Sequence, residues 1–459
     1  RRCEYNKAIE YYEKSLKIRL DKLGHDHPSV ATLYNSLGNV YESKGEYDKA
    51  IECYEKDLKI SLDKLGHDHL HVATLYNNLR NVYESKGEYD RVIEYYEKSL
   101  KIQLSKLGHD HPHVATSYNN LGNVYENKGE YDKAIGYYEK SLKITLDKLG
   151  HDHPDVATLY NNLGLVYKSK GEYDKAIKYY KKDLKITLYK LGHDHLDVAT
   201  SYNNLGNVHK SKGEYDKAIE YYEKDLKISL DKLGYDHPDV ATSYNNLGNV
   251  YESKGEYDKA IGYYEKSLKI VLDKLGHDHP RVAALYNSLG NVYESKGEYD
   301  KSIECREKDL KISLDKLKYD HPGVAASYHN LGSVYWKKGE YNKAIKYHKK
   351  SLKIELKKLR HDHPDVATLY NSLGNVYESK GEYDKAIEYY EKSLKIRLDK
   401  LGYNHPNVAT SYHNLGSVYW KKGEYDKAIE YYEKSLKIRL DKLGHDHPHV
   451  AISYNNLGN

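Results

Sequence analysis

A glycine recurs every 42 residues along most of the chain, and no insertion or deletion interrupts the series. The ten positions are Gly45, Gly87, Gly129, Gly171, Gly213, Gly255, Gly297, Gly339, Gly381 and Gly423. Fixed periods of roughly 20 to 50 residues are typical of repeat proteins, in which each unit buries its apolar face against its neighbours. The period therefore predicts one continuous array, although 459 residues would otherwise suggest about three ordinary domains.

The period also predicts the boundaries of the repeats within a single array spanning residues 1–459. Ten full repeats are expected at 31–72, 73–114, 115–156, 157–198, 199–240, 241–282, 283–324, 325–366, 367–408 and 409–450. A partial repeat at 1–30 would hold only a second helix, and a truncated repeat would occupy 451–459. Because the chain has no Met and both ends fall inside a repeat, we expect it to be a fragment of a longer protein.

Each repeat has the pattern of two helices, as the residues around 115–156 illustrate. A first apolar series, with steps of four, three and four, consists of Val114, Tyr118, Leu121 and Tyr125. It follows Pro112, which suits the first position of a helix, and it ends at Gly129, which suits a left-handed C-cap. A second series ends at Gly150 and consists of Tyr131, Ile135, Tyr138, Leu142 and Leu149. The pattern predicts an all-α chain of helical hairpins joined by HDHP loops, with Asp152 expected to cap the next helix.

One glycine lies inside the first helix rather than at its end. Gly122 costs about 1 kcal/mol there relative to Ala, so we expect it to permit close approach of the partner helix. Ten of eleven units keep this glycine, and Arg80 is the exception. At Arg80 we expect a local splaying of the helices or a guanidinium that reaches out to solvent.

These residues resemble a known repeat family. The series Tyr118, Leu121, Gly122, Tyr125, Ala134 and Tyr138 is similar to the tetratricopeptide repeat signature, although Ser141 and Leu146 stand where that signature usually has Ala and Pro. The 42-residue period and the string LGHDHPDVATLYNNLG at 149–164 resemble kinesin light chains and nephrocystin-3-like proteins. The resemblance implies an α-solenoid of stacked helix-turn-helix hairpins forming a right-handed superhelix, with first helices lining the inner wall.

Composition and motifs argue against several functional classes. The formal net charge is only +4, so no electrostatic case exists for a nucleic-acid or membrane partner, and no apolar run is long enough to span a bilayer. An active site is one asymmetric set of groups, whereas most polar residues here recur about eleven times, and no phosphate loop or nucleophile motif occurs. We therefore expect no enzyme activity and no cofactor.

We also expect no metal site. Most histidines lie in the HDHP loops, where His151 and His153 could offer only two nitrogens, whereas a closed zinc site needs four ligands. Cys3, Cys53 and Cys305 fit no metal or disulfide spacing. A reducing compartment, and hence a cytoplasmic location, is expected.

The polar face of the first helix is the candidate binding surface. Asn occupies the Asn119 position in nine of eleven units and the Asn123 position in eight, so stacked repeats would form two rows of carboxamides. A carboxamide offers a donor and an acceptor and can pair with an extended peptide backbone. The alternative is that duplication merely copied a soluble face. The predicted partner-binding residues are Asn77, Asn81, Asn119, Asn123, Asn161, Asn203, Asn207, Asn245, Asn249, Asn287, Asn291, His329, Trp336, Asn371, Asn375, His413 and Trp420.

The two tryptophans occur in one duplicated block, 84 residues apart. Trp336 and Trp420 stand at the Glu126 position, and each block also replaces the two ladder asparagines, with His329 and His413 in one row and Ser333 and Ser417 in the other. On a polar face the indoles would be binding anchors about 20 Å apart, which an extended peptide covers in about six residues. In the alternative, each indole rests on its own lysine-rich turn.

Together these features predict a non-catalytic scaffold that binds a peptide in its groove, similar to the cargo-binding region of a kinesin light chain. The segment 337–360 holds ten Lys or Arg against two Glu, which favours an acidic partner, although lysine-rich helices are often only solvated. The first alternative is the sensor or regulatory arm of a larger signalling NTPase or protease. An RNA-binding array is disfavoured by the near-neutral charge. Self-association through the uncapped terminal repeats is also expected.

Overall fold

The computed structural model describes residues 2–458, and the side chains of residues 4–458. The described residues form 22 helices and no strand. The first helices of the repeats are α2 (Pro28–Lys44), α4 (Leu70–Lys86), α6 (Pro112–Asn127), α8 (Pro154–Ser169), α10 (Leu196–Ser211), α12 (Pro238–Lys254), α14 (Pro280–Ser295), α16 (Pro322–Lys337), α18 (Pro364–Ser379), α20 (Pro406–Lys422) and α22 (Pro448–Gly458). The second helices are α1 (Arg2–Leu23), α3 (Tyr47–Leu65), α5 (Tyr89–Leu107), α7 (Tyr131–Leu149), α9 (Tyr173–Leu191), α11 (Tyr215–Leu233), α13 (Tyr257–Leu275), α15 (Tyr299–Lys316), α17 (Tyr341–Lys358), α19 (Tyr383–Leu401) and α21 (Tyr425–Leu443).

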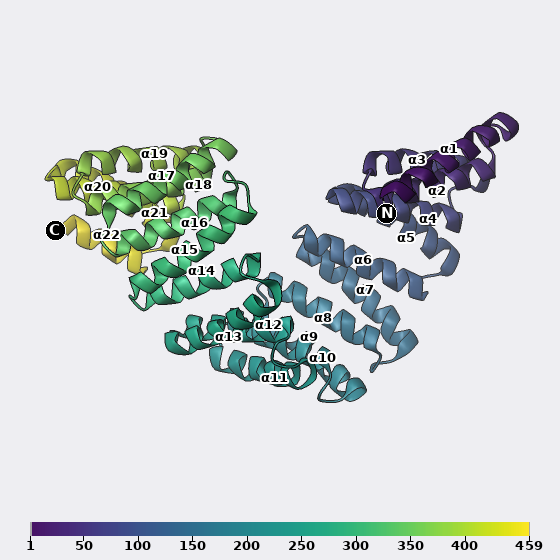
Figure 1. The fold of residues 1–459 in the computed structure, drawn as a ribbon, viewed down its shortest axis with the longest axis horizontal. Coiled ribbons are helices and arrows are strands. Elements are labelled where there is room, and N and C mark those ends of the chain that lie inside the picture. The colour runs from purple at the N-terminus through teal and green to yellow at the C-terminus, as the bar shows by residue number, and fades with distance from the viewer. Residues whose placement is uncertain (1, 459) are drawn as a thin grey trace. The chain divides into compact units, whose positions relative to one another are not determined.

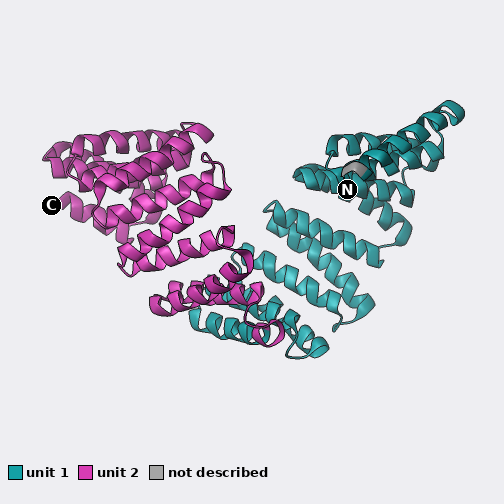
Figure 2. Cartoon of the chain, in the orientation of Figure 1, with its two compact units in different colours: residues 1–228 teal, residues 229–459 magenta. Residues whose placement is uncertain are grey.

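The chain forms two compact units, residues 1–228 and 229–459, with the boundary inside α11 (Figures 1 and 2). Within each unit, first and second helices alternate, and consecutive helices pack against one another from α1 to α10 and from α12 to α22. The predicted all-α solenoid of helical hairpins is therefore confirmed. That all repeats form one array with a right-handed path stays a prediction.

The core of each repeat comes from the apolar series read in the sequence. Val114 and Leu121 of α6 and Ala134 and Tyr138 of α7 are completely buried, and the equivalent residues of the other full repeats repeat this arrangement with few substitutions. Because α6 buries one side against its own second helix and its sequence neighbours, its Asn-rich side is left toward the surface.

Each first helix with a described cap begins at a histidine and not at the expected aspartate. His153 adopts an extended conformation, and its Nδ1 accepts a hydrogen bond from the backbone N–H of Asp155 at 3.1 Å. Pro154 occupies the first helical position. A backbone N–H there would have no partner within the helix, so the N–H that proline lacks is not needed. The expectation that Asp152 caps the helix is therefore wrong, because the second histidine of the loop already supplies the acceptor. At the other end, Gly45 closes α2 in the left-handed conformation with φ 81°.

The glycine inside the first helix makes room for a tyrosine. A Cβ atom added to Gly122 would lie 2.5 Å from Cε1 of Tyr138, so the close helix approach inferred from the sequence is present. At the exceptional unit, the Arg80 guanidinium lies 4.4 Å from the Tyr96 ring centre and donates to the Tyr96 hydroxyl at 2.6 Å. The arginine therefore stacks on the ring that the glycine would otherwise admit, and it does not reach out to solvent.

Two glycines at this position allow a matched test of that contact. We expect Gly374→Ala to lower the free energy of unfolding by about 1–2 kcal/mol, because its Cβ would lie 2.5 Å from the buried Tyr390 ring. Gly290→Ala is the control: its Cβ would meet only the Arg306 Cγ at 3.1 Å, a much smaller overlap, so helix propensity should make it neutral or stabilising by up to about 1 kcal/mol. Urea denaturation followed by circular dichroism measures both, and equal effects would contradict the explanation.

Candidate partner-binding face

The first carboxamide row is tied together from repeat to repeat. Asn119 Oδ1 accepts a hydrogen bond at 2.9 Å from Nδ2 of Asn162, which lies on the first helix of the following repeat. The same pairing, with a separation of 43 residues, joins Asn78 to Asn35, Asn204 to Asn161, Asn330 to Asn287 and Asn414 to Asn371. The pairing uses the carbonyl oxygen of the row and leaves the Nδ2 hydrogens of Asn119 for an acceptor.

The second carboxamide row is held by buried tyrosines. The Tyr138 hydroxyl lies 2.7 Å from both Asn123 Oδ1 and Glu126 Oε2. Tyr54, Tyr264 and Tyr390 make the same pair of contacts in their repeats, and Tyr222 contacts Asn207 alone. Burial and the contact with Glu126 raise the pKa of Tyr138 above its usual value, so the hydroxyl keeps its single proton, which the oxygens of Asn123 and Glu126 share.

Both rows therefore present the same chemistry outward. Where these contacts form, the carboxamide oxygens are occupied by donors of the protein and the Nδ2 groups are the part left over, except in Asn207, which donates to Asn203 at 2.7 Å. Such rows suit carbonyl or carboxylate oxygens of a ligand. The sequence indicated where the carboxamides lie but not which end of each one points outward.

The remaining predicted asparagines differ in their surroundings. Asn291 Oδ1 accepts from the buried Arg306 at 2.9 Å, in place of a tyrosine. Asn77, Asn81 and Asn245 make no side-chain hydrogen bond within the described part of the chain.

The two histidines of the first row are partly buried and face aromatic neighbours. The His329 ring centre lies 5.0 Å from that of His348, which is fully buried at the usual tyrosine position, and neither Nδ1 has a partner among the described residues. Burial lowers the pKa of His329, and it lowers the pKa of His348 to about 3. In the second block, His413 lies 5.5 Å from Tyr432, and its Nδ1 is 3.4 Å from Asn456 Nδ2.

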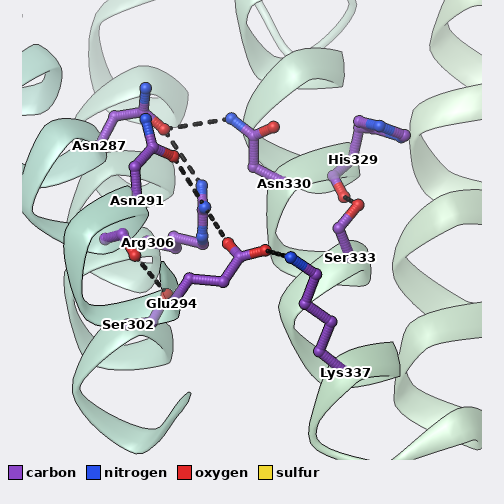
Figure 3. A network of polar contacts seen from close by, with 10 residues as sticks. Asn287, Asn291, Glu294, Ser302, Arg306, His329, Asn330, Ser333 and Lys337 are labelled. Atoms are coloured by element: carbon purple, nitrogen blue, oxygen red, sulfur yellow. Dashed lines mark hydrogen bonds and ion pairs between the residues drawn. The ribbon is translucent and has the colours of Figure 1, made fainter. Parts of the chain in front are cut away.

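The tryptophan blocks connect to the repeats on either side. Trp336 Nε1 donates to Ser379 Oγ at 2.9 Å on the next first helix, and its ring packs partly into the core. The adjacent Lys337 reaches back to Glu294 of the preceding repeat at 2.8 Å (Figure 3). Trp420 is 46% exposed, and no described residue stands where Ser379 stands for Trp336. Trp336 thus rests on the following repeat rather than on its own lysine-rich turn.

Several of the lysines expected to attract an acidic partner are already ion-paired. Lys338 pairs with Asp300 at 2.6 Å, and Lys357 and Lys358 both reach Asp320.

The structure also contains a feature that the sequence interpretation missed, a pocket at the junction of successive repeats. Between α6, α7 and α8 the pocket has a volume of about 290 Å³, and its lining includes Thr116, Asn119, Thr145, Asp155 and Thr158. Three similar pockets of about 220, 270 and 300 Å³ occur at other junctions. In all four, the residues at the Thr145 and Asp155 positions are part of the lining.

A signal for these pockets was present in the sequence. The Thr145 position takes six residue types over its eleven occurrences, as does the Asp155 position, and no other position of the repeat varies as much. The two most variable positions of the repeat line one pocket.

Other candidate sites carry no such geometry. Within the described residues, no three His, Cys, Asp or Glu side chains are grouped to hold a metal ion, and no helix could cross a membrane. Cys53 and Cys305 are free and buried, and burial raises the pKa of each thiol to about 11. The Cys3 side chain lies outside the described part.

Comparison with known protein families matches the sequence of the chain to one family model, described as the tetratricopeptide repeat. The matches overlap along the whole chain, at residues 1–63, 30–105, 71–147, 113–188, 155–231, 197–273, 239–315, 281–357, 323–399, 365–441 and 407–459. No curated protein matches the chain.

Solved structures with similarity to the chain are also repeat proteins. A Podosopora anserina protein assigned as a kinesin light chain, with nearly identical TPR-like repeats, is 26% identical, with 45% of this chain and 98% of that chain covered and a TM-score of 0.41. BtubC from P. vanneervenii is 24% identical, with 50% and 91% covered and a TM-score of 0.42. A signal transduction ATPase with a tetratricopeptide repeat sensor, from Pyrococcus horikoshii, is 17% identical, with 80% and 53% covered and a TM-score of 0.53.

Proposed function

The chain belongs to the tetratricopeptide repeat family, and from that premise we propose that it is a non-catalytic scaffold that binds an extended peptide segment along the Asn-rich faces of its first helices. Repeats of this family are typical of protein–protein interaction scaffolds. The observation that carries the proposal is the orientation of the carboxamides. Asparagines of the following repeat, such as Asn162, and buried tyrosines, such as Tyr138, hold their oxygens. Their outward N–H groups can donate to the backbone carbonyls of a peptide. Every peptide has these carbonyls, whatever its sequence.

The finer role that we propose is a cytoplasmic cargo adaptor similar to a kinesin light chain. It is supported by the 42-residue period and the string at 149–164. A second candidate is the sensor arm of a larger signalling NTPase or protease. It is favoured by the fold shared with the Pyrococcus horikoshii ATPase, whose repeats are described as a sensor.

Substituting Asp for Asn tests the donor role directly, because the oxygen is kept while the Nδ2 donor is lost. We expect the double variant Asn119→Asp and Asn161→Asp to bind a peptide selected from a displayed random library about tenfold more weakly than the parent, from two lost hydrogen bonds of about 0.5–1.5 kcal/mol each. Fluorescence anisotropy of the labelled peptide measures the affinity.

Asn342→Asp is the matched control. Asn342 is exposed near the start of α17, where nine of the other repeats carry Asp, so the same chemical change should leave the affinity unaltered. The proposal fails if the library yields no binder, or if the double variant and the control bind equally well.

A further inference from the structure

The inter-repeat junctions differ from one another mainly at the variable Thr145 position. Through residue 313 of the chain, every junction after the first carries an uncharged residue there. The next three junctions carry Glu355, Arg397 and Arg439 in succession. All three charged side chains belong to the unit 229–459.

Glu355 is a mostly buried residue whose carboxylate keeps some contact with solvent and has no partner among the described residues. Its exposed fraction is 9%, and within the described residues its side chain makes no hydrogen bond or ion pair. At the equivalent place, Gln103 accepts from Ser117 of the next first helix at 2.7 Å, but the residue facing Glu355 by register is the buried Leu369, which has no donor. The sequence therefore places a charge where the repeat has removed its usual partner.

The charges around Glu355 do not compensate it. Asp365, at the second variable position of the same junction, adds a carboxylate, and burial together with Asp365 raises the pKa of Glu355. The neighbouring Lys358 pairs with Asp320 at 3.2 Å, and His363 Nδ1 lies 3.5 Å from Asp365. The junction of α16, α17 and α18 thus holds two acidic groups and lacks a cation committed to Glu355.

The following two junctions have the opposite sign. Arg397 Nη1 donates to Ser411 Oγ at 2.8 Å and to the Asn407 carbonyl at 3.2 Å. Arg439 repeats these contacts with Ser453 at 2.8 Å and the His449 carbonyl at 3.2 Å. Both guanidinium groups are positioned by neutral acceptors, and no carboxylate of the described residues pairs with either.

We propose that these three junctions select the order of charges in the bound peptide: a cationic side chain enters beside Glu355 and Asp365, and carboxylates meet Arg397 and then Arg439. The inference rests on the proposed function and specifies its partner. Repeats about 10 Å apart correspond to about three residues of extended peptide. The partner segment therefore carries one basic and two acidic residues, with about three residues of peptide from each charged residue to the next.

The test uses five labelled peptides of one uncharged polar sequence. Four carry three charged residues, three positions apart, in the sign orders +−−, −−+, −++ and ++−, and one carries none. We expect the peptide with one cation and two anions, in one of its two chain directions, to bind at least about tenfold more tightly than the uncharged one. Glu355→Gln should remove that preference for a cation, while Glu388→Gln, at an exposed carboxylate of α19, should not.

A charge-reversal variant and a measurement of thermal stability provide two further tests of the role of Glu355. Glu355→Arg should shift the preference to a sixth peptide, of the same uncharged background, that carries three acidic residues, and Glu355→Gln should raise the melting temperature, since it removes an unpaired and partly desolvated charge. Binding that is independent of charge order, or a Glu355→Gln variant that melts lower, overturns the inference and leaves peptide binding intact. Failure of all five peptides also overturns it, whereas the proposed function is judged separately by the random library.

Discussion

Replacing Arg306 by alanine is expected to lower the free energy of unfolding by about 3–5 kcal/mol. Arg306 is almost fully buried at the position where most repeats have tyrosine. Its guanidinium donates to Asn287 at 3.2 Å, to Asn291 at 2.9 Å and to the mostly buried Glu294 (Figure 3). Alanine would leave these acceptors without their shared donor, in a site that water enters poorly. Denaturant unfolding of the variant measures the loss.

Arg306→Tyr is the matched control, because the chain already contains the product of that change. The Tyr390 hydroxyl, 84 residues further on, lies 2.7 Å from Asn375 Oδ1 and 2.6 Å from Glu378 Oε2, and Glu378 pairs with Lys421 just as Glu294 pairs with Lys337. The tyrosine variant should therefore stay within about 1 kcal/mol of the parent. An alanine variant as stable as the tyrosine variant would show that the network contributes little.

Acidification from pH 7 to pH 5 is expected to destabilise the parent by about 2 kcal/mol more than the His348→Tyr variant. Burial lowers the pKa of His348 to about 3, whereas an unfolded histidine titrates near 6.5. Below pH 6.5 the unfolded chain takes up a proton that folded His348 does not. Stability is therefore lost as the pH falls from about 6.5 toward 3, and at pH 5 the difference is about 1.5 pH units at 1.36 kcal/mol each.

Tyrosine fits at residue 348 because the second tryptophan block has that arrangement, with Tyr432 beside His413. His413, whose pKa burial also lowers, remains in both proteins and cancels in the comparison, whereas His329 lies beside the substituted ring and belongs to the same site. The measurement is the urea midpoint as a function of pH. Parallel pH profiles of the two proteins would contradict the assignment of the acid sensitivity to His348.

Local patterns were enough to predict the helices. Pro112 and Gly129 bound the first helix, and Gly150 follows the second; the structure has helices at 112–127 and 131–149. Gly122 correctly indicated close helix approach, since the tyrosine that needs the space lies only 16 residues away. The cap was predicted wrongly at Asp152, because both the aspartate and His153 can accept a hydrogen bond and only the loop conformation selects between them.

The sequence was enough to predict where the carboxamides of the candidate site lie, but not which of their atoms are already hydrogen-bonded within the protein. The asparagine rows follow from helix periodicity, but the direction of each carboxamide depends on donors such as Asn162 on the adjacent repeat and Tyr138 on the partner helix. That Trp336 is a binding anchor stays a prediction, and its hydrogen bond to Ser379, 43 residues away, could not be inferred from its own helix. The pockets were missed because three helices of two repeats form each one.

By itself, the sequence determined the repeat period, the two helices of each unit, the buried series along them and the all-α class, because these depend on residues a few positions apart on one helix. Only the tertiary structure decided which polar groups are satisfied and which face outward. Gln103 and Ser117 hydrogen-bond across a junction, whereas Glu355 has Leu369 at the position equivalent to Ser117 and stays unpaired. Such outcomes depend on the register in which one helix packs on the next, and a hydrogen bond forms only where that register brings donor and acceptor within about 3 Å.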